Sequence, residues 1–436
     1  MLINFRVANF RSLKEPQELD LRPVYRDGPE SLNVCAVYGA NASGKSNVLR
    51  ALEFMHNAVT DQGGWNMRNR IHLTPFLLDR ESAEQPTSFA VELDIEGVKY
   101  AYGFSATQER ITEEWLHSFP KKKKRVLFER DGDTYYFGPS FASARAEVIR
   151  EITPATSLYI STASKANHDT STGAVHSWFV RHLWFADDTE DSRSFQRGNT
   201  LALLRSEEKK GRVERLIKAA DLGISETRIE EIEFREDPAA EDRGIRPAFH
   251  ISYESGKATV LYRGERPELP PRLLAHLEAE SALTFRHRGS AEHDFTLDDQ
   301  SRGTRTWFDI SGMVVRALDE GNTLVVDELD TSLHPLLLAQ MIKLFQRRDS
   351  NPRGAQLVFT THDASLMGRN RGEELLRRDE IWFTQKNAET GSTELYPLTD
   401  FKPRDGLNWE KRYLGGSVGG VPYISETGFE EALSRP

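Results

Sequence analysis

One eight-residue stretch, Gly39–Ser46, limits the folds that this chain can adopt more than any other part of its sequence. It reads GANASGKS and fits the phosphate-binding pattern G-x-x-x-x-G-K-[ST]. The apolar run Val34–Tyr38 precedes it, and Asn47–Met55 follows with apolar residues at helical spacing. A strand, a glycine loop and a helix form the structural context that this motif requires. We therefore predict that Lys45 reaches the β- and γ-phosphates of a nucleotide and that the Ser46 hydroxyl binds Mg²⁺.

Length and composition are those of a large globular chain. The 436 residues are enough for two or three domains' worth of core. No apolar run approaches the ~20 residues of a membrane span, and Met1–Arg6 lacks the pattern of a signal peptide. The single cysteine, Cys35, excludes an internal disulfide and a cysteine-based zinc site. We expect a cytoplasmic protein without a membrane partner.

The formal net charge of −10 argues against a protein that coats DNA non-specifically. One basic run, Lys121–Arg125, departs from this balance. Its first interpretation is a solvated loop between two strands, and its second is a contact with nucleic acid or an acidic partner.

Periodicity divides the chain into residues 1–140, 141–285 and 286–436. The first part is predicted to hold the phosphate loop and an antiparallel β layer, and the third a C-terminal lobe of the same α/β core. The middle part has the character of a mainly helical insertion with a β-like pair near residues 248–262, and we expect it to form an oligomer or partner surface. Strands are predicted at residues 1–9, 19–21, 34–38, 88–95, 98–104, 111–119, 125–130, 134–137, 323–328 and 356–360, and helices at 46–60, 175–184, 213–220 and 306–318.

The stretch Thr323–Glu328 is the second candidate site element. It is an apolar strand that ends in Asp-Glu, which suits the carboxyl edge of a parallel sheet, where such folds bind ligands. We expect Asp327 to hold Mg²⁺ and Glu328 to orient and polarise the attacking water.

Two further segments flank this strand in the sequence. Ser301–Thr304 begins a helical stretch, where free N–H groups and a hydroxyl can bind an anion. The buried strand Gln356–Thr360 ends in Thr361-His362-Asp363, and a histidine there can contact the γ-phosphate and the attacking water.

These elements stand in the order of ABC- and SMC-type ATPases, and the chain resembles that class. More narrowly, it resembles the stand-alone AAA-family ATP-binding proteins of bacterial anti-phage defence operons, of the RloA, AriA and PtuA types. The segments that carry this resemblance are Asn9–Ser12, Gly39–Ser46, Thr74–Phe76, Ser301–Thr304, Asp327–Asp330, Ser332–Pro335, Thr361–Asp363 and Tyr413–Pro422. They span nearly the whole chain, and the middle insertion is the least diagnostic part.

The resemblance implies ATP and Mg²⁺ as cofactors and an ABC/SMC-type fold. It also implies a head-to-tail dimer, in which Ser301 and Gly303 of one subunit cap the γ-phosphate that Lys45 of the other subunit holds. The catalytic residues would be Glu328, His362 and Lys45. Further nucleotide contacts are expected from Gly39, Asn41, Gly44, Asn47, Arg11 and Asp330.

The chain departs from the ABC pattern at two points. Arg302 and Thr304 stand where transporters have the fuller Leu-Ser-Gly-Gly-Gln signature. A lid-loop glutamine is not identified either, and Gln85 is a weak candidate.

The overcoming-lysogenization-defect nucleases join a similar ATPase to a Toprim domain, but only about 74 residues follow His362, so we expect no nuclease activity in this polypeptide.

We therefore expect an ATPase that acts as a sensor or scaffold for a separate effector, a nuclease encoded nearby, in anti-phage defence. One alternative is a DNA-end-binding repair ATPase without long coiled coils. Another is a slow ATP-switched scaffold whose turnover serves as a timer. The insertion and the signature argue against a transporter, and the lack of Asn-Lys-x-Asp argues against a GTPase.

Overall fold

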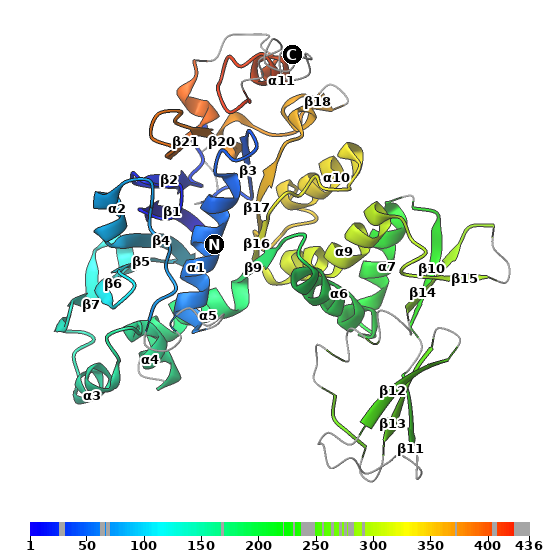
Figure 1. Cartoon of the computed structure of the whole chain (residues 1–436), viewed down its shortest axis with the longest axis horizontal. Helices are drawn as coiled ribbons and strands as arrows, with labels where there is room; N and C mark the ends of the chain where they lie inside the picture. The colour runs from blue at the N-terminus through cyan, green and yellow to red at the C-terminus, as the bar shows by residue number, and fades with distance from the viewer. Residues whose placement is uncertain are drawn as a thin grey trace, which may run out of the picture. The chain divides into compact units, whose positions relative to one another are not determined.

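The chain folds into two compact units, here seen in a computed structural model (Figure 1). Unit 1 comprises Met1–Trp184, Gly321–Glu328 and Met341–Pro436, and unit 2 comprises Phe185–Glu320 and Leu329–Gln340. The predicted division at residues 140 and 285 stays a prediction about domains. The structure describes residues 1–25, 31–61, 66, 70–166, 170–220, 222–229, 232–236, 249–254, 257–262, 266–269, 273, 277, 283–289, 293–370, 373–402 and 408–422.

Unit 1 contains a seven-stranded antiparallel sheet, which confirms the predicted β layer. The turn at Glu96 and Gly97 has φ values of 52° and 79°, as a tight hairpin between two strands requires. Along β4 buried and partly exposed residues alternate, so one face of the sheet is turned to the core. In spatial order the strands are β2 (Gln17–Asp20), β1 (Leu2–Ala8), β4 (Thr87–Ile95), β5 (Val98–Ala106), β6 (Ile111–Phe119), β7 (Arg125–Asp131) and β8 (Thr134–Phe137).

A six-stranded sheet carries the candidate site. Four neighbouring strands in it are parallel, and the edge strand β21 runs antiparallel to β20. All residues of β3, β16 and β17 are buried, as expected for parallel strands covered on both faces. The spatial order is β21 (Thr393–Pro397), β20 (Ile381–Lys386), β3 (Val34–Gly39), β17 (Gln356–Thr361), β16 (Thr323–Val326) and β9 (Leu183–Ala186). The α/β core predicted from the sequence is confirmed.

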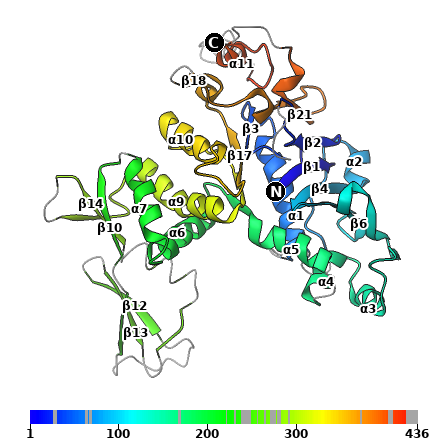
Figure 2. The ribbon, with the colours of Figure 1, turned by 180° about the vertical axis from the view of Figure 1, so that it is seen from behind.

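The helix after the phosphate loop, α1 (Lys45–Thr60), contacts β3 of this sheet and β1 and β4 of the antiparallel sheet (Figure 2). Its buried face includes Val48, Leu52, Met55 and Val59, which follow helical spacing. The helix ends at Asp61, whose backbone is left-handed with φ 56°. The glycines at 63 and 64, predicted to end it, lie outside the described residues. The other helices of unit 1 are α2 (Arg80–Glu84), α3 (Ala144–Ile152), α4 (Tyr159–Lys165), α5 (Thr170–His182) and α11 (Trp409–Leu414).

The helix predicted to reach Trp184 ends two residues earlier. Leu183–Ala186 forms β9 instead, at the edge of the six-stranded sheet. This short run is apolar and therefore fits the periodicity of a helix as well as that of a buried strand. Pairing with the sheet decides its conformation.

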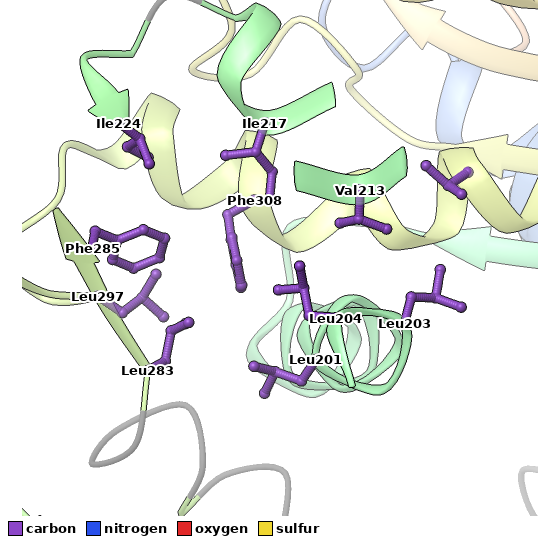
Figure 3. Packing of buried hydrophobic residues seen from close by; sticks show 11 residues of the cluster. Leu201, Leu203, Leu204, Val213, Ile217, Ile224, Leu283, Phe285, Leu297 and Phe308 are labelled. Carbon is purple, nitrogen blue, oxygen red and sulfur yellow. The ribbon is translucent and has the colours of Figure 1, made fainter. Parts of the chain in front are cut away.

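The described part of unit 2 includes the helices α6 (Glu190–Leu204), α7 (Lys210–Ala219) and α9 (Arg302–Glu320). They enclose a core together with β10 and β14, as Figure 3 shows. In it Phe308 of α9 meets Phe285 of β14 edge to face, with 5.2 Å between ring centroids. The predicted helices at 213–220 and 306–318 and the β pair at 248–262 are confirmed. The strands are β10 (Ile224–Ile229), β14 (Leu283–His287) and β15 (Asp294–Thr296) in one sheet, and β11 (Glu233–Glu236), β13 (Lys257–Tyr262) and β12 (Phe249–Glu254) in another.

Helices α6 and α9 approach closely at Gly312. A Cβ on this glycine would lie 2.5 Å from Thr200 Cα, so only glycine permits the crossing. The Thr200 hydroxyl donates to the Asp309 carbonyl oxygen over 2.9 Å and accepts the Gly312 N–H over 2.9 Å. Next to this contact, Arg197 binds the buried Asp309 carboxylate through two hydrogen bonds of 2.9 and 3.2 Å. The start of α9, where Ser301 and Gly303 lie, is thereby held on a rigid helix pair.

No helix within the described ranges is both long and apolar enough to cross a membrane.

The remaining elements include α10 (Pro335–Gln346), β18 (Arg369–Asn370) and β19 (Glu373–Glu374).

Candidate nucleotide site

The phosphate loop joins β3 to α1 in unit 1. Ala42 and Gly44 have left-handed backbones, with φ values of 62° and 106°, and α1 begins directly after Gly44 at Lys45. The Lys45 side chain is only 5% exposed, and its Nζ donates to the carbonyl oxygens of Gly39 at 2.9 Å and Ala40 at 3.1 Å. The ammonium group is therefore held over the loop, in front of a positive helix end. Asn41 is exposed at the tip of the loop.

The predicted metal-binding residues meet each other. The Ser46 hydroxyl donates to Asp327 Oδ1 over 3.1 Å, although 281 residues separate the two in the chain. Asp327 follows β16, and the parallel pairing of β16 with β17 and of β17 with β3 brings its carboxylate to the carboxyl edge that also carries the loop. The structure thus brings Lys45, Ser46 and Asp327 to one edge of the sheet.

A residue that the sequence analysis missed connects this pair to Glu328. The Thr360 hydroxyl donates to Asp327 Oδ1 over 2.6 Å and accepts the Glu328 backbone N–H over 2.7 Å. Glu328 is exposed and has φ 53°, a left-handed conformation that is uncommon for non-glycine residues. The available signal was a hydroxyl residue near the end of an otherwise apolar strand.

Two threonines, one on β20 and one on β21, contact Ser43 of the phosphate loop. Thr384 Oγ1 lies 2.6 Å from Ser43 Oγ, and the Thr393 hydroxyl donates to the Ser43 carbonyl oxygen over 2.8 Å. A Cβ on Gly39 would collide with Thr384, and one on Gly44 would collide with Thr393. Both glycines of the motif are therefore required by packing as well as by phosphate access. Strand β21, which carries Thr393, was not predicted from the sequence.

The segments Asn9–Ser12 and Thr74–Phe76, which carry part of the family resemblance, contact each other. The Arg11 N–H donates to the Thr74 carbonyl oxygen over 2.9 Å, and the Phe76 N–H donates to Asn9 Oδ1 over 3.0 Å. The turn also touches the loop helix, because Asn47 Nδ2 donates to Ser12 Oγ over 2.7 Å. Asn47 thus supports this turn.

Arg11 itself is exposed, with a left-handed backbone at φ 50°. Partial burial and the like charge of Arg50 on α1 lower the pKa of its guanidinium group, while Glu53 acts in the opposite direction. An arginine close to a second arginine favours a nearby anion. The placement is compatible with the nucleotide contact expected of Arg11.

The glycine-rich tail also belongs to this region. Tyr413 of α11 packs against Tyr38 of β3, with ring centroids 5.7 Å apart, and its hydroxyl donates to the Gly420 carbonyl oxygen over 3.3 Å. A Cβ on Gly420 would lie 3.7 Å from Gly39 Cα, so the tail reaches the first residue of the loop.

The predicted signature lies in unit 2 with the loop that carries Asp330. Ser301 Oγ accepts the Thr304 N–H over 3.2 Å and so caps α9. A Cβ on Gly303 would lie 2.5 Å from the Ser332 carbonyl oxygen, two residues after Asp330. Arg302 forms an ion pair of 2.6 Å with Asp188. Ser301, Gly303 and the Asp330 loop therefore form one structural block.

His362 directly follows β17 and is exposed. Thr361 pairs with Tyr38 of β3, which places the histidine at the edge where the phosphate loop begins. Gln85, the weak lid candidate, ends α2, where its carbonyl oxygen accepts a hydrogen bond of 2.9 Å from Asn9.

The side chains present suit a magnesium-bound nucleotide. In the described part of the chain no group of three or more His, Cys, Asp or Glu residues could hold a metal on its own. Ser46 and Asp327 supply the hydroxyl and carboxylate oxygens that Mg²⁺ prefers, and Mg²⁺ commonly completes such a shell with phosphate oxygens and water. Lys45 supplies the positive charge that the phosphates need.

A match to one protein family agrees with this geometry. Residues 34–368 match the family described as "AAA domain, putative AbiEii toxin, Type IV TA system". No curated protein matches the chain. Among solved structures, it is similar to an SMC head domain from Thermotoga maritima at 14% identity, covering 91% of this chain and 98% of that one with a TM-score of 0.39.

Two further SMC heads are similar at 11% identity. One is described as bound to the C-winged helix domain of ScpA, with 91% of this chain and 97% of that one covered and a TM-score of 0.44. The other is described as an SMC head with an extended coiled coil, bound to the C-terminal domain of ScpA derived from Pyrococcus furiosus. The match covers 95% of this chain and 98% of that one, with a TM-score of 0.38. Because the family match spans more than half of the chain and includes the phosphate loop, Asp327 and His362, this chain belongs to that AAA-domain family.

Proposed function

We propose that this chain is a magnesium-dependent ATPase. The observation that carries the proposal is the continuous hydrogen-bonded chain from Ser46 through Asp327 and Thr360 to Glu328, beside the buried ammonium group of Lys45. This chain of hydrogen bonds joins the phosphate loop to the carboxylate proposed to bind Mg²⁺, and to a second carboxylate residue proposed to orient the attacking water.

Each residue has a role that follows from its position. Lys45 neutralises charge on the β- and γ-phosphates, and Ser46 and Asp327 hold Mg²⁺, which when bound adds Lewis-acid stabilisation of the phosphates. Glu328 is exposed at the strand end, with its backbone held by Thr360, so its carboxylate can orient a water and accept a proton from it. His362 directly follows the neighbouring strand β17, where it can contact the γ-phosphate.

We further propose that ATP joins two copies of the chain. Ser301, Gly303 and the Asp330 loop form one block in unit 2, and this block would supply the second half of the site to another subunit. ATP that contacts both subunits stabilises the dimer by its higher affinity for the closed state. This dimeric unit would act in the cytoplasm as a sensor or scaffold for an effector, a nuclease encoded nearby, in anti-phage defence. Support for that role comes from the sequence resemblance to defence ATPases and from a family description that includes a toxin–antitoxin system.

The ATPase and assembly proposals are tested with two variants measured side by side. Lys45→Ala should abolish ATP binding. Glu328→Gln should preserve ATP binding, nearly abolish hydrolysis and accumulate the larger assembly. The readouts are phosphate release and particle mass with and without ATP, and Glu389→Gln, an exposed glutamate of unit 1, serves as the control. Unchanged rate and mass in both site variants would contradict the assignment.

The effector proposal needs a separate experiment. Co-expression with the neighbouring genes and a pull-down should recover a stable protein partner that carries the nuclease activity. Nuclease activity of the chain alone, without any such partner, would contradict it.

A second candidate, a DNA-end-binding ATPase, is favoured by the basic hairpin tip. Lys121–Arg125 is exposed throughout, as predicted, and Lys121 and Lys122 both have positive φ, at 55° and 62°. Fluorescence anisotropy with a blunt DNA duplex at several salt concentrations tests this candidate. If it holds, Lys121→Glu with Lys122→Glu should weaken binding and reduce its salt dependence.

A further inference from the structure

Unit 2 contains a cavity of about 1050 Å³ that the ATPase proposal does not use. One wall is the flank of α7, and another is formed by five consecutive residues of β10, Ser225–Ile229. Successive side chains of a strand point to opposite faces of its sheet, so a cavity that touches five residues in a row lies along the edge of the strand. The cavity is therefore a groove between the edge of β10 and the helix, here called the β10 groove.

Strand β10 has an open side along this groove. The order of its sheet is β10, β14 and β15, so β14 occupies only one side of it. Among the described residues, none forms a hydrogen bond with a backbone N–H or C=O group of Ser225–Ile229 on the other side. Such an edge can pair with another extended chain, and strand addition is a recurring way in which one protein binds a segment of another.

Helix α7 covers one face of this sheet beside the open edge. Its residues Val213 and Ile217 share a core with Ile224 of β10 and Phe285 of β14, as Figure 3 shows. A strand added to β10 would point every second side chain toward this face, where the flank of α7 stands. The groove lining on that flank is Lys210, Glu214 and Lys218, here called the α7 row.

The spacing of the α7 row matches that of an extended chain. Residues four apart on one side of a helix are separated by about 6 Å along its axis. Side chains two apart on one face of a strand are separated by about 6.5 Å. Three successive side chains on one face of an added strand can therefore meet the three members of the row. The complementary pattern is acidic, basic and acidic, which reads the same in both strand directions.

The charges of the α7 row are available to a ligand. None of the three forms an ion pair with another described residue. By contrast, Arg228 on β10 already pairs with Glu226 over 2.9 Å and with Asp294 over 3.1 Å. Selection among extended segments therefore falls to the α7 row, while the edge of β10 supplies the backbone pairing.

The lining also distinguishes between kinds of occupant. Its glutamates, Glu207, Glu214 and Glu226, oppose a polyanion such as nucleic acid. Two antiparallel copies of β10 would bring both α7 helices to the same face of the joined sheet. Adjacent strands are only about 4.8 Å apart, whereas packed helices need about 8–10 Å. A lone extended segment brings no helix with it and fits the groove.

We propose that the β10 groove binds an extended segment of a partner protein as a fourth strand of this sheet. The segment carries acidic, basic and acidic side chains at alternate positions, opposite the α7 row. The proposal does not rest on the ATPase assignment, because both walls of the groove belong to unit 2 and the measurements below need no ATP.

Fluorescence anisotropy of the full chain with two labelled peptides, TTETKTETT and TTKTETKTT, tests the charge pattern. The wild-type chain should bind the first peptide at least about fivefold more tightly than the second. The triple variant Lys210→Glu, Glu214→Lys and Lys218→Glu should reverse this preference. Arg215→Glu, an exposed residue of α7 outside the lining, is the matched control and should keep the wild-type preference. No saturable binding, or the same preference in the wild-type chain and the triple variant, would overturn the proposal.

Hydrogen exchange tests the strand addition itself. With saturating TTETKTETT, exchange of the fragment that contains Ser225–Ile229 should slow at least about tenfold, because new backbone hydrogen bonds protect its amides. Unchanged exchange would mean binding through side chains alone and would overturn the added strand. A dimer that forms without ATP and that the peptide dissociates would assign the groove to a second copy. A nine-nucleotide DNA strand that displaces the peptide would assign it to nucleic acid, and either result would also overturn the proposal.

Discussion

Thr360 and Asp327 share a hydrogen bond of 2.6 Å, in which the threonine hydroxyl donates to the carboxylate oxygen that Ser46 also contacts. The same hydroxyl accepts the Glu328 N–H over 2.7 Å. One side chain therefore sets the spacing between the residue proposed to hold Mg²⁺ and the residue proposed to orient water. Its position on β17 ties both to the strand that lies between β16 and β3.

Replacing Thr360 with valine should impair hydrolysis more than ATP binding. Valine has nearly the same shape, but it leaves Asp327 without one donor and the Glu328 N–H without its acceptor. At about 1–3 kcal/mol for an unsatisfied group, the rate of phosphate release should fall roughly ten- to hundredfold. Thr360→Ser keeps the hydroxyl and should retain most of the rate. A valine variant with the wild-type rate would contradict the role assigned to Thr360.

How far the sequence could predict this site depends on how local each signal is. The loop and its helix were predictable because strand, glycine turn and helix follow one another within a few residues. The Asp327 strand was predictable because its short apolar run ends directly in Asp-Glu. Thr360, Thr384 and Thr393 were not, because a threonine in a strand becomes a site residue only through pairing with distant segments. Thr393 lies 350 residues from Ser43, whose carbonyl oxygen it binds.

The fold shows the same limit. The antiparallel β layer was predicted nearly strand by strand, since alternation and the Glu96-Gly97 turn are local signals. Strand β9 was missed because Leu183–Ala186 continues an apolar helical pattern, and only its place in the six-stranded sheet decides its conformation.

Gly303→Ala should uncouple hydrolysis from ATP binding. The new Cβ would lie 2.5 Å from the Ser332 carbonyl oxygen, so the start of α9 and the Asp330 loop must move apart. Because both belong to the half-site proposed to act on another subunit, phosphate release and ATP-dependent dimer mass should fall while ATP affinity stays within about twofold. Gly173→Ala in α5 is the matched control, since its Cβ would meet no atom within 4 Å. Equal activity of the two alanine variants would refute the proposed role of the Gly303 contact.

Arg197→Met should destabilise unit 2 by about 3–5 kcal/mol at neutral pH. It removes the partner of Asp309, whose side chain is 1% exposed. Burial already raises the pKa of the Asp309 carboxyl, and the Arg197 charge opposes that rise. Without the arginine, the carboxyl can fold cheaply only in its protonated form, so the destabilisation should be smaller at pH 5 than at pH 8. Urea unfolding of the two chains at both pH values measures it.

The double variant Arg197→Met with Asp309→Leu controls for this. Replacing both partners by apolar side chains leaves no buried charge, so most of the stability should return. If the double variant were as unstable as Arg197→Met alone, lost packing of the arginine stem rather than the unpaired carboxylate would be the cause.

Glu380 should make the stability of unit 1 depend on pH. Burial raises the pKa of this carboxyl from 4.5 to about 7, against the opposing charge of Arg377. A carboxyl whose folded pKa lies above its unfolded value stabilises the fold fully below pH 4.5, and that contribution is lost as pH rises through about 7. The loss should amount to about 3 kcal/mol. Glu380→Gln cannot ionise, so the difference in unfolding free energy between wild type and variant should change between pH 5 and pH 8 in favour of the variant. Glu389→Gln, which removes an exposed carboxyl, should show no such change, and a flat difference for Glu380→Gln as well would mean that this carboxyl is ionised in the fold across the whole range.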